Sequence, residues 1–429
     1  MSTFFVRRDG SDDGGCDFVL EVGTNLFAGE RDFEEAFGAP TSLESDLLLI
    51  GASVFAADRA CARGEREDNA RRIGLDIPVV NAGRLVPLAR EIENILRILS
   101  NDGWRLNLRH SQGSPEPSRT PSVAAGRTLL FSGGLDSLAA AVEFGDKGED
   151  LQLVSHKTRN RQTDRGQKDL VALMKDRGLD LPHHQFFVSS RDGGPSPLQH
   201  DVENSQRTRS FLFLILGALA AKRAGHGEIV YLAENGQMAI HLPITQGRIG
   251  SFSTHTAHPD FLDAMEKFLN NALQTSFRII NPYVYKTKAE VVKVVVDNLP
   301  ASIPVSHSCW RNARLPEGVT HCGACVPCFI RRIAVEHWTL PDPTAYGDDP
   351  WSDGTLHRST DDTARRNMAD LTEFIIRMGR MSNEEIMSEW PELYSPNLEA
   401  TQVIDMYRRF AAEAKDVLGK YPALAPLLS

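Results

Sequence analysis

The sequence of 429 residues is long enough for two or three domains, and 41% hydrophobic with 24% charged residues is the composition of a soluble globular protein. A net charge of −10 argues against a surface that binds nucleic acid over most of its area, although a local basic cleft would still allow it. No stretch of about 18 apolar residues is free of charge, and the start, MSTFFVRRDG, lacks the apolar core of a signal peptide. We therefore expect a cytoplasmic protein without a membrane span.

Residues 1–110 predict a mixed α+β unit. Its predicted elements are, in chain order, strands at 3–8 and 17–22, a helix from Leu43 to Arg63 behind a Ser42 cap, a strand at 73–80, a helix at 85–104 and a strand at 104–111. We expect the strands to form a small antiparallel sheet. Cys16, Cys61 and His110 are isolated along the chain, and such residues are usually structural, so the unit shows no catalytic constellation.

Residues 111–126, SQGSPEPSRTPSVAAG, are rich in Ser, Pro and Gly and predict a linker. Strands and helices alternate from Arg127 onward, which is typical of a parallel sheet with helices on both faces. Strands are predicted at 128–132, 151–155, 184–190 and 228–234, and helices from the first strand to about Gly145, at 168–178, at 206–225 and at 286–299. Ligands bind such sheets at the carboxyl ends of the strands, so the loops there should line one cleft.

The first of these loops carries the strongest signal. In TLLFSGGLDSLAAA, a strand runs into a turn containing Gly133 and Gly134 and then into a helix. Two glycines let successive N–H groups and the helix N-terminus converge on one point, which favours a phosphate. Ser132 and Ser137 add hydroxyl donors, and Asp136 could hold a magnesium ion. The pattern is neither a Walker loop nor a dinucleotide fingerprint.

The other loops carry suitable polar groups. A basic loop follows the second strand, and its cations, which either face an anion or are solvated, are Lys157, Arg159, Arg161 and Arg165. Later groups could pair with the edge of a base, namely Glu234, Asn235 and Gln237. His255 and His258 suggest substrate contact or helix capping more than metal binding. Lys286 and Lys288 begin a helix, from which a lysine could reach pyrophosphate.

Four of the six cysteines are clustered in SCWRNARLPEGVTHCGACVPC, as Cys309, Cys322, Cys325 and Cys328. Thiolates at this spacing can converge tetrahedrally on zinc, with Gly323 easing the tight turn. An iron–sulfur cluster is the main alternative, and disulfides are disfavoured in a reducing compartment. Four protein ligands leave no open position, so we expect a structural zinc that staples the loops closing the cleft.

Together, the loop at 132–137, Arg207-Thr208 with Phe211-Leu212, INPYVYKTKAEVV and the cysteine cluster ending in Arg331 resemble the 7-cyano-7-deazaguanine synthase (QueC-like) branch of the PP-loop ATP pyrophosphatases. The resemblance covers about residues 127–337. It implies adenylation of 7-carboxy-7-deazaguanine by ATP, attack by ammonia, and dehydration of the amide to a nitrile with a second ATP. It also implies that pyrophosphate is bound by Ser132, Gly133, Gly134, Leu135, Asp136 and Ser137, that zinc is bound by the four cysteines, and that Arg207 and Lys288 contact phosphate or substrate.

The chain departs from the synthases at Thr208, in HKTRNRQTD and in AENGQMAIHLP, and it has additional terminal regions. Its layout is more similar to the QueC-like QatC proteins of the bacterial Qat anti-phage defence system. The domains implied are an N-terminal α+β domain at 1–110, a linker at 111–126, a PP-loop domain at 127–340 and a helical extension at 341–429. The resemblance implies an ATP-dependent ligase that passes a deazaguanine-type acid to ammonia or to an amine of a partner protein. A nucleic-acid-modifying PP-loop enzyme and a non-enzymatic nucleotide-binding scaffold are the alternatives.

Overall fold

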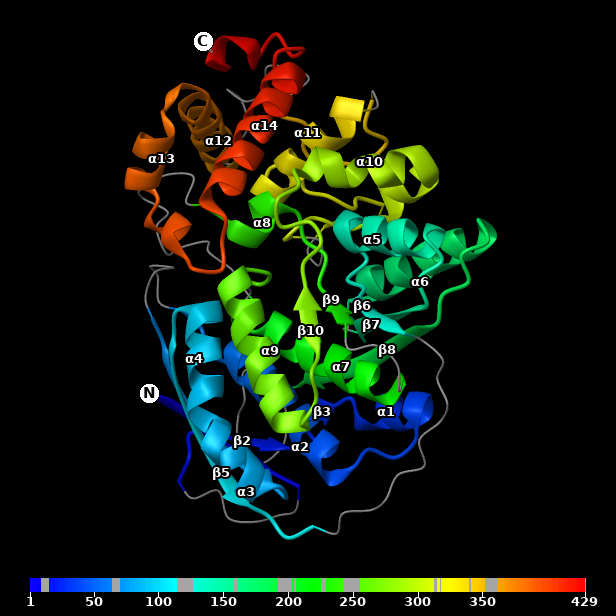
Figure 1. Ribbon diagram of the computed structural model, residues 1–429, viewed down its shortest axis with the longest axis vertical. Helices are drawn as coiled ribbons and strands as arrows, with labels where there is room; N and C mark the ends of the chain where they lie inside the picture. The colour runs from blue at the N-terminus through cyan, green and yellow to red at the C-terminus, as the bar shows by residue number, and fades with distance from the viewer. Residues whose placement is uncertain are drawn as a thin grey trace.

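The computed structural model describes residues 1–8, 15–63, 70–113, 126–157, 160–191, 203, 206–224, 229–242, 255–311, 315, 316, 318–338, 341–351 and 362–428. Most of the predicted linker, residues 114–125, therefore lies outside the described residues. The N-terminal elements gather at one end of the molecule and the C-terminal helices at the other, with the central region between them (Figure 1). None of the described helices is long and apolar enough to cross a membrane.

A six-stranded sheet forms the centre, in the order β10-β9-β6-β7-β8-β3. Its strands are β6 (Arg127–Leu130), β7 (Leu151–Lys157), β8 (His183–Ser190), β9 (Ile229–Tyr231), β10 (Arg278–Ile280) and β3 (Leu26–Ala28). The pairs that join β10, β9, β6, β7 and β8 are parallel, and β3 is antiparallel to β8. These pairs confirm the predicted parallel sheet. Its strands run in one direction because helical crossovers connect them.

Helices cover both faces of this sheet. One face is packed by α5 (Leu135–Asp146), α6 (Arg161–Asp176) and α10 (Lys288–Asn298), and the other by α7 (Arg209–Ala224) and α9 (Pro259–Leu273). The remaining helices of the central region are α8 (Gly236–Ile240), η3 (Pro300–Val305) and α11 (Val326–Trp338). The apolar runs of α5 and α7 are buried nearly throughout, as helices between a sheet and a second layer require.

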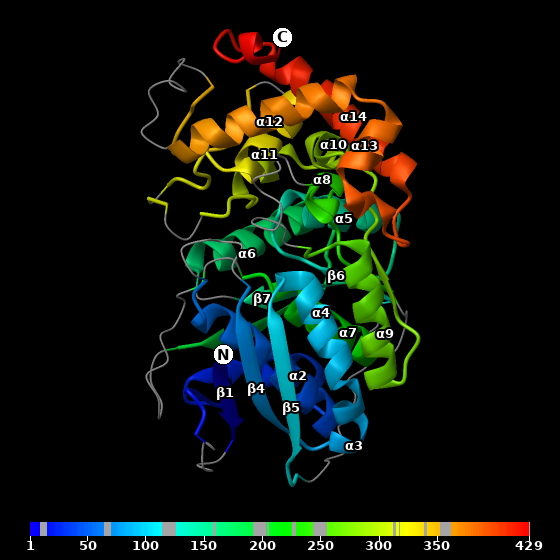
Figure 2. The same cartoon turned by 90° about the vertical axis from the view of Figure 1, so that its left-hand side faces the viewer.

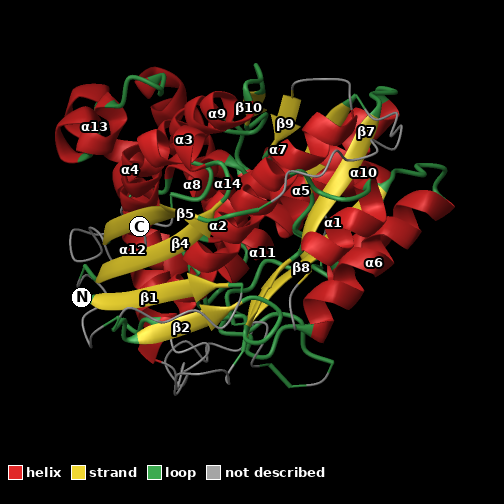
Figure 3. Cartoon of the chain, turned by 90° about the horizontal axis from the view of Figure 1, so that it is seen from below, coloured by secondary structure: helices red, strands yellow, loops and turns green. Residues whose placement is uncertain are grey.

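A second sheet belongs to the N-terminal unit and has the order β2-β1-β4-β5. Its strands, which lie side by side in Figure 3, are β1 (Ser2–Arg7), β2 (Phe18–Glu21), β4 (Arg72–Val79) and β5 (Gly103–His110). All three strand pairs are parallel, so the predicted antiparallel sheet is wrong. Helical connections separate β4 from the first strands and from β5, and such crossovers bring strands back in the same direction. These helices are α1 (Glu30–Phe37), α2 (Ser42–Ala60), α3 (Ala82–Leu85), η1 (Val86–Leu88) and α4 (Ala89–Ser100).

Two parts of the N-terminal unit are built into the central region. Strand β3 extends the central sheet, and α2 packs against α7 on the face of that sheet. Helix α2 begins after Thr41, whose side chain accepts from the Glu44 N–H while the Glu44 carboxylate accepts from the Thr41 N–H, so the N-cap is one residue earlier than predicted. One apolar core therefore runs through both regions.

The C-terminal region is helical, as predicted. It contains α12 (Asp362–Arg380), α13 (Asn383–Glu389), η6 (Pro391–Tyr394), α14 (Ala400–Leu418) and η7 (Ala425–Leu428). Helices α12 and α14 pack on each other and on α11 (Figure 2). Met406 and Tyr407 of α14 reach α8, where the Tyr407 hydroxyl accepts from the Leu242 N–H at 3.1 Å. The C-terminal region therefore covers α8, which lies next to the carboxyl edge of the central sheet.

Candidate functional site

The predicted phosphate loop connects β6 to α5 at the carboxyl end of the central strand. Gly133 has φ +83°, and a Cβ there would lie 3.0 Å from the Gln167 side chain. The Ser137 hydroxyl donates to the Gly134 carbonyl at 3.1 Å and lies 3.2 Å from the Ser132 hydroxyl. The first N–H groups of α5 have no partner within the helix, so the loop joins unpaired donors, two hydroxyls and the positive end of a helix of 12 residues.

Four polar side chains meet behind this loop, and we call them the Asp136 cluster: Asp136, Glu234, Asn235 and Lys288. The Lys288 ammonium lies 2.7 Å from Asp136 Oδ2, and the Asn235 amide donates to the same oxygen at 3.1 Å. The side chains of Lys288 and Asp136 are each 8% exposed. The structure thus brings together the predicted Asp136 and Lys288, which are far apart in the sequence.

The Asp136 cluster has an excess of acid groups. Burial, followed by the negative charge of Asp136, raises the pKa of Glu234 well above its ordinary value of 4.5, and Lys288 opposes this shift. Asp136 Oδ1 is buried and has no hydrogen-bond partner in the part of the chain that the structure describes. Two carboxyl groups beside one ammonium, with one carboxylate oxygen unsatisfied, are suitable ligands for a divalent cation.

Asn235 and Gln237, which were predicted to pair with the edge of a base, make hydrogen bonds within the protein instead. Asn235 caps α8 through its side-chain oxygen and donates to Asp136, and Gln237 Oε1 accepts from the Lys288 N–H at 2.7 Å. These two side chains thus shape the Asp136 cluster. Helix α8 has five residues and corresponds to no element predicted from the sequence. The role of Glu234 was missed, since only the fold places it beside Asp136.

Arg207, a predicted phosphate or substrate contact, lies toward the N-terminal unit. It is 3% exposed and donates to the Ser100 carbonyl at 3.2 Å. Burial, followed by the positive charge of Arg63, lowers its pKa. Next to it, Asp58 of α2 accepts from both the N–H and the hydroxyl of Thr208, which fixes the chain entering α7. The structure therefore places Arg207 at the junction with the N-terminal unit, and its role in binding stays a prediction.

The remaining predicted groups are dispersed. Arg159 and the side chain of Arg161 lie outside the described residues, and Arg165 is 83% exposed on α6 beside Asp169. His258 caps α9, accepting from the Asp260 N–H at 3.2 Å, which agrees with the expected capping role. Its ring centroid lies 5.1 Å from that of His255.

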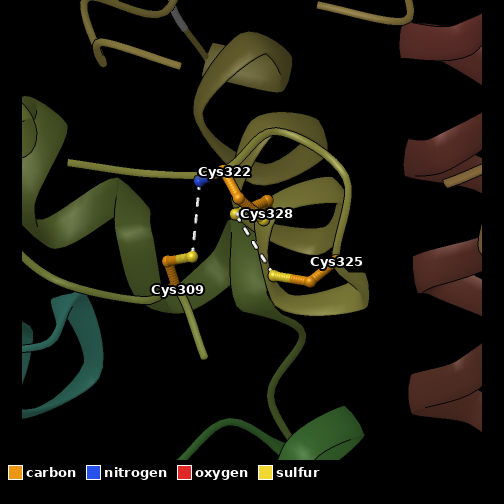
Figure 4. A group of neighbouring side chains, drawn as sticks. All are labelled: Cys309, Cys322, Cys325 and Cys328. Carbon is orange, nitrogen blue, oxygen red and sulfur yellow. Dashed lines mark hydrogen bonds between the residues drawn. The ribbon is translucent and has the colours of Figure 1, made fainter. Parts of the chain in front are cut away.

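The four predicted cysteines converge, as Figure 4 shows. Their sulfur atoms all lie within 4.8 Å of one another, and all four residues are buried. Backbone N–H groups of Cys322 and Arg311 each donate to Cys309 Sγ at 3.3 Å, as thiolates bound to a metal require. Gly323 has φ +78°, and a Cβ there would lie 1.8 Å from the Asp348 carbonyl. The donor set therefore fits zinc in a closed, structural site.

The cysteine centre is joined to the phosphate loop. The His307 N–H, close to Cys309 in sequence, donates to the Gly133 carbonyl at 2.9 Å. Arg331 of α11 is fully buried and donates to the hydroxyls of Ser306 and Ser308 at 3.0 and 3.2 Å. Since α11 also carries Cys328, the metal centre and the phosphate loop share one hydrogen-bonded support.

Comparison with known proteins finds matches in one family. The family model described as "Queuosine biosynthesis protein QueC" matches residues 218–339, which include all four clustered cysteines. A 7-cyano-7-deazaguanine synthase from Rhizobium leguminosarum bv. trifolii is 30% identical over 244 residues, which cover 52% of this chain and 92% of that relative. Proteins of the same name from Rhizobium johnstonii and Paracoccus denitrificans are 28% and 27% identical, and the matches cover 54% of this chain and 95% and 97% of those relatives. The chain therefore belongs to the 7-cyano-7-deazaguanine synthase (QueC) family.

Proposed function

We propose that the protein is an ATP-dependent ligase that adenylates a carboxylic acid, 7-carboxy-7-deazaguanine or a close relative, and transfers the acyl group to an amine. The observation that carries this proposal is the Ser132–Ser137 loop with the buried Asp136–Lys288 pair behind it. The names of the family relatives support the class of acid. A loop of unpaired N–H donors above an ammonium suits the release of pyrophosphate.

ATP would lie with its phosphates over the loop, in contact with the N–H groups of Leu135 through Ser137 and with the hydroxyls of Ser132 and Ser137. Asp136 and Glu234 would hold a magnesium ion, since Asp136 Oδ1 lacks a partner and the Asp136 cluster has an excess of acid groups. Such an ion neutralises charge on the polyphosphate. Lys288, fixed at 2.7 Å from Asp136, would stabilise the departing pyrophosphate with its positive charge.

In the first step, a carboxylate oxygen of the acid attacks the α-phosphorus of ATP. The bond from the α-phosphorus to its bridging oxygen breaks, and pyrophosphate leaves with the electron pair. The amine then attacks the acyl carbon, AMP leaves, and the amine gives up its proton to solvent. The chain contributes the in-line orientation of ATP and acid and the positive groups that face the leaving oxygens.

The zinc held by Cys309, Cys322, Cys325 and Cys328 would have a structural role. With four protein ligands it offers no position to a substrate. It would instead fix the segment whose His307 N–H holds the Gly133 carbonyl. The cysteine centre is thus proposed to keep the phosphate loop in its binding conformation.

The acceptor is proposed to be ammonia or an amine of a partner protein, in the setting of anti-phage defence that the resemblance to QatC suggests. The matched relatives cover 52–54% of this chain, which leaves a large part of the protein outside the synthase match. The N-terminal unit reaches the start of α7 through Asp58, and α14 covers α8. We propose that these regions present a macromolecular acceptor to the site.

The proposal is tested by measuring AMP and pyrophosphate release from ATP by the zinc-loaded protein, with and without 7-carboxy-7-deazaguanine, first with ammonium and then with candidate partner proteins. Asp136→Ala should abolish AMP formation and keep the zinc. Asp263→Ala, on the exposed face of α9, is the control and should keep both the zinc and AMP formation. AMP formation that persists in Asp136→Ala would refute the assigned role. ATP binding without AMP would favour a scaffold, and AMP that depends on tRNA would favour a nucleic-acid-modifying enzyme.

A further inference from the structure

Arg209, the first residue of α7, has a guanidinium that is only partly satisfied by the residues that the structure describes. Its Nε and Nη2 atoms are buried and have no hydrogen-bond partner among those residues. Burial and the nearby Arg59 lower the pKa of Arg209 to about 10, so the group stays charged near neutral pH. A buried cation without a partner is costly to a folded protein, and proteins normally place an anion beside it.

A second buried group lies beside Arg209. His156 of β7 is fully buried and its Nε2 lies 2.8 Å from the Val188 carbonyl. Its Nδ1 has no hydrogen-bond partner among the described residues. Burial lowers the pKa of His156 to about 3, so the ring is neutral and Nδ1 carries a lone pair. The His156 ring and the Arg209 guanidinium both contact Phe213, at 6.2 and 5.4 Å from its ring centroid. Two unsatisfied polar side chains thus share one aromatic neighbour.

The geometry of the free donors indicates the kind of group that would satisfy them. Nε and Nη2 form one edge of the planar guanidinium, with their N–H bonds roughly parallel. That edge matches the two oxygens of a carboxylate in a bidentate pair. A single water could satisfy one donor but would leave the charge unpaired.

The place of Arg209 in the fold favours the acid over the phosphates of ATP. The loop and α5 lie on one face of the central sheet, whereas α7 packs on the other. The two sites are nonetheless neighbours, because Leu130 pairs with Val154 across β6 and β7 and the next N–H, that of Phe131, donates to the Val154 carbonyl at 2.7 Å. The phosphate loop therefore begins beside the end of β7, which carries His156. Adjacent strands are about 5 Å apart, a distance that a small acid can bridge.

We propose that Arg209 binds the carboxylate of the acid that the enzyme adenylates, through a bidentate pair with Nε and Nη2, and that His156 helps to orient that acid. This rests on the proposed function. The carboxylate would supply the missing anion and would lie beside the phosphate loop, from which the α-phosphorus of ATP is presented. Arg209 would then determine affinity for the acid and leave affinity for ATP unchanged.

The test uses Arg209→Met, Arg209→Lys and a control, Arg165→Met, which removes an exposed arginine of α6. The exchange of pyrophosphate into ATP is measured against 7-carboxy-7-deazaguanine, and ATP binding is measured without the acid. Arg209→Met should raise the KM for the acid about 10–100-fold with unchanged ATP binding. Arg209→Lys, which keeps the charge and loses the fork, should fall between it and the wild type.

A melting experiment distinguishes this role from a structural one. Without ligand, Arg209→Met should melt at a higher temperature than the wild type, because an apolar side chain replaces an unpaired buried charge. The acid should protect the wild type but not this variant. An unchanged KM for the acid in Arg209→Met, or a lower melting temperature with normal protection, would overturn the assignment. If the wild type catalyses no exchange, the proposed function fails, and the melting data decide alone: protection that Arg209→Met loses supports the assignment, and equal or no protection overturns it.

Discussion

Replacing Lys288 by Met should destabilise the protein to an extent that depends on pH. The Lys288–Asp136 pair is 2.7 Å long with both side chains 8% exposed, and removing one partner of a buried pair costs about 3–5 kcal/mol. The Asn235 amide still donates to Asp136, and Glu234 can hold a proton, so part of the cost is offset. We expect a loss of about 2–3 kcal/mol in the free energy of unfolding at pH 8.

The sign of the pH dependence follows from Glu234. Its pKa in the folded protein is already above 4.5, and Lys288 lowers it, so removal of Lys288 raises it further. A carboxyl group with a raised pKa holds its proton in the folded state, and its cost grows as pH rises above the value of the unfolded chain. The stability gap between the wild type and Lys288→Met should therefore be smaller at pH 5.5 than at pH 8.5.

The measurement is urea unfolding followed by tryptophan fluorescence at both pH values, together with the rate of AMP formation. The control is Lys293→Met on the same helix, whose lysine is 47% exposed and pairs with Asp297. Loss of the charge that is proposed to stabilise the departing pyrophosphate should lower AMP formation about 100–1,000-fold in Lys288→Met alone. If the two variants have the same stability at both pH values, the Lys288–Asp136 pair does not have the energetic role argued here.

Three further predictions concern other parts of the structure. Cys309→Ala should lose the zinc and show faster hydrogen exchange in the loop at 132–137, because the His307 N–H would no longer be held against the Gly133 carbonyl. The control Cys16→Ala should keep the zinc and the slow exchange of the wild type. Unchanged exchange in a zinc-free variant would refute the link between the zinc and the loop. Gly133→Ala, at φ +83° and 3.0 Å from the Gln167 side chain, should weaken ATP binding at least 10-fold in calorimetry, while Gly178→Ala, at φ +96° in open space, should lose only about 1–2 kcal/mol of stability. Burial raises the pKa of Glu413 to about 7, so the free energy that this carboxyl group costs the fold grows between pH 4.5 and 7. In thermal unfolding, Glu413→Gln, which still accepts from the Thr287 hydroxyl, should be about 1–2 kcal/mol more stable than the wild type at pH 8 and no more stable at pH 4.5.

The sequence predicted those features that depend on local pattern. The glycine loop, the alternating elements of the central sheet, the cysteine spacing and the helical C-terminal region all place their signal within a few neighbouring residues. Elements of three to five residues, such as β3 and α8, were missed because they are too short to show a period. The direction of the N-terminal strands was wrong, although the helix predicted between them already indicated crossovers.

The contents of the candidate site were less predictable. Asp136 and Lys288 were identified separately, but the acid group that completes their cluster, Glu234, was read as a contact for a base, because only the fold shows its distance from Asp136. Arg207 was assigned by resemblance, whereas its surroundings come from the N-terminal unit. The sequence carries no signal for Arg209, two positions later in the chain, because only the three-dimensional structure shows which donors of a guanidinium lack a partner among the described residues.

Strand β3 has a consequence for the lateral edge of the central sheet. It pairs with β8 through residues 26–28, and Asp32 accepts from the Phe187 N–H farther along the same edge. An exposed strand edge offers unpaired backbone groups to other chains and promotes aggregation. A fragment that begins at the apparent boundary near residue 111 would expose this edge together with the apolar face of α7 that α2 covers. We therefore expect the N-terminal unit to protect the central region from self-association, so that trimming the chain to the length of its relatives yields insoluble protein.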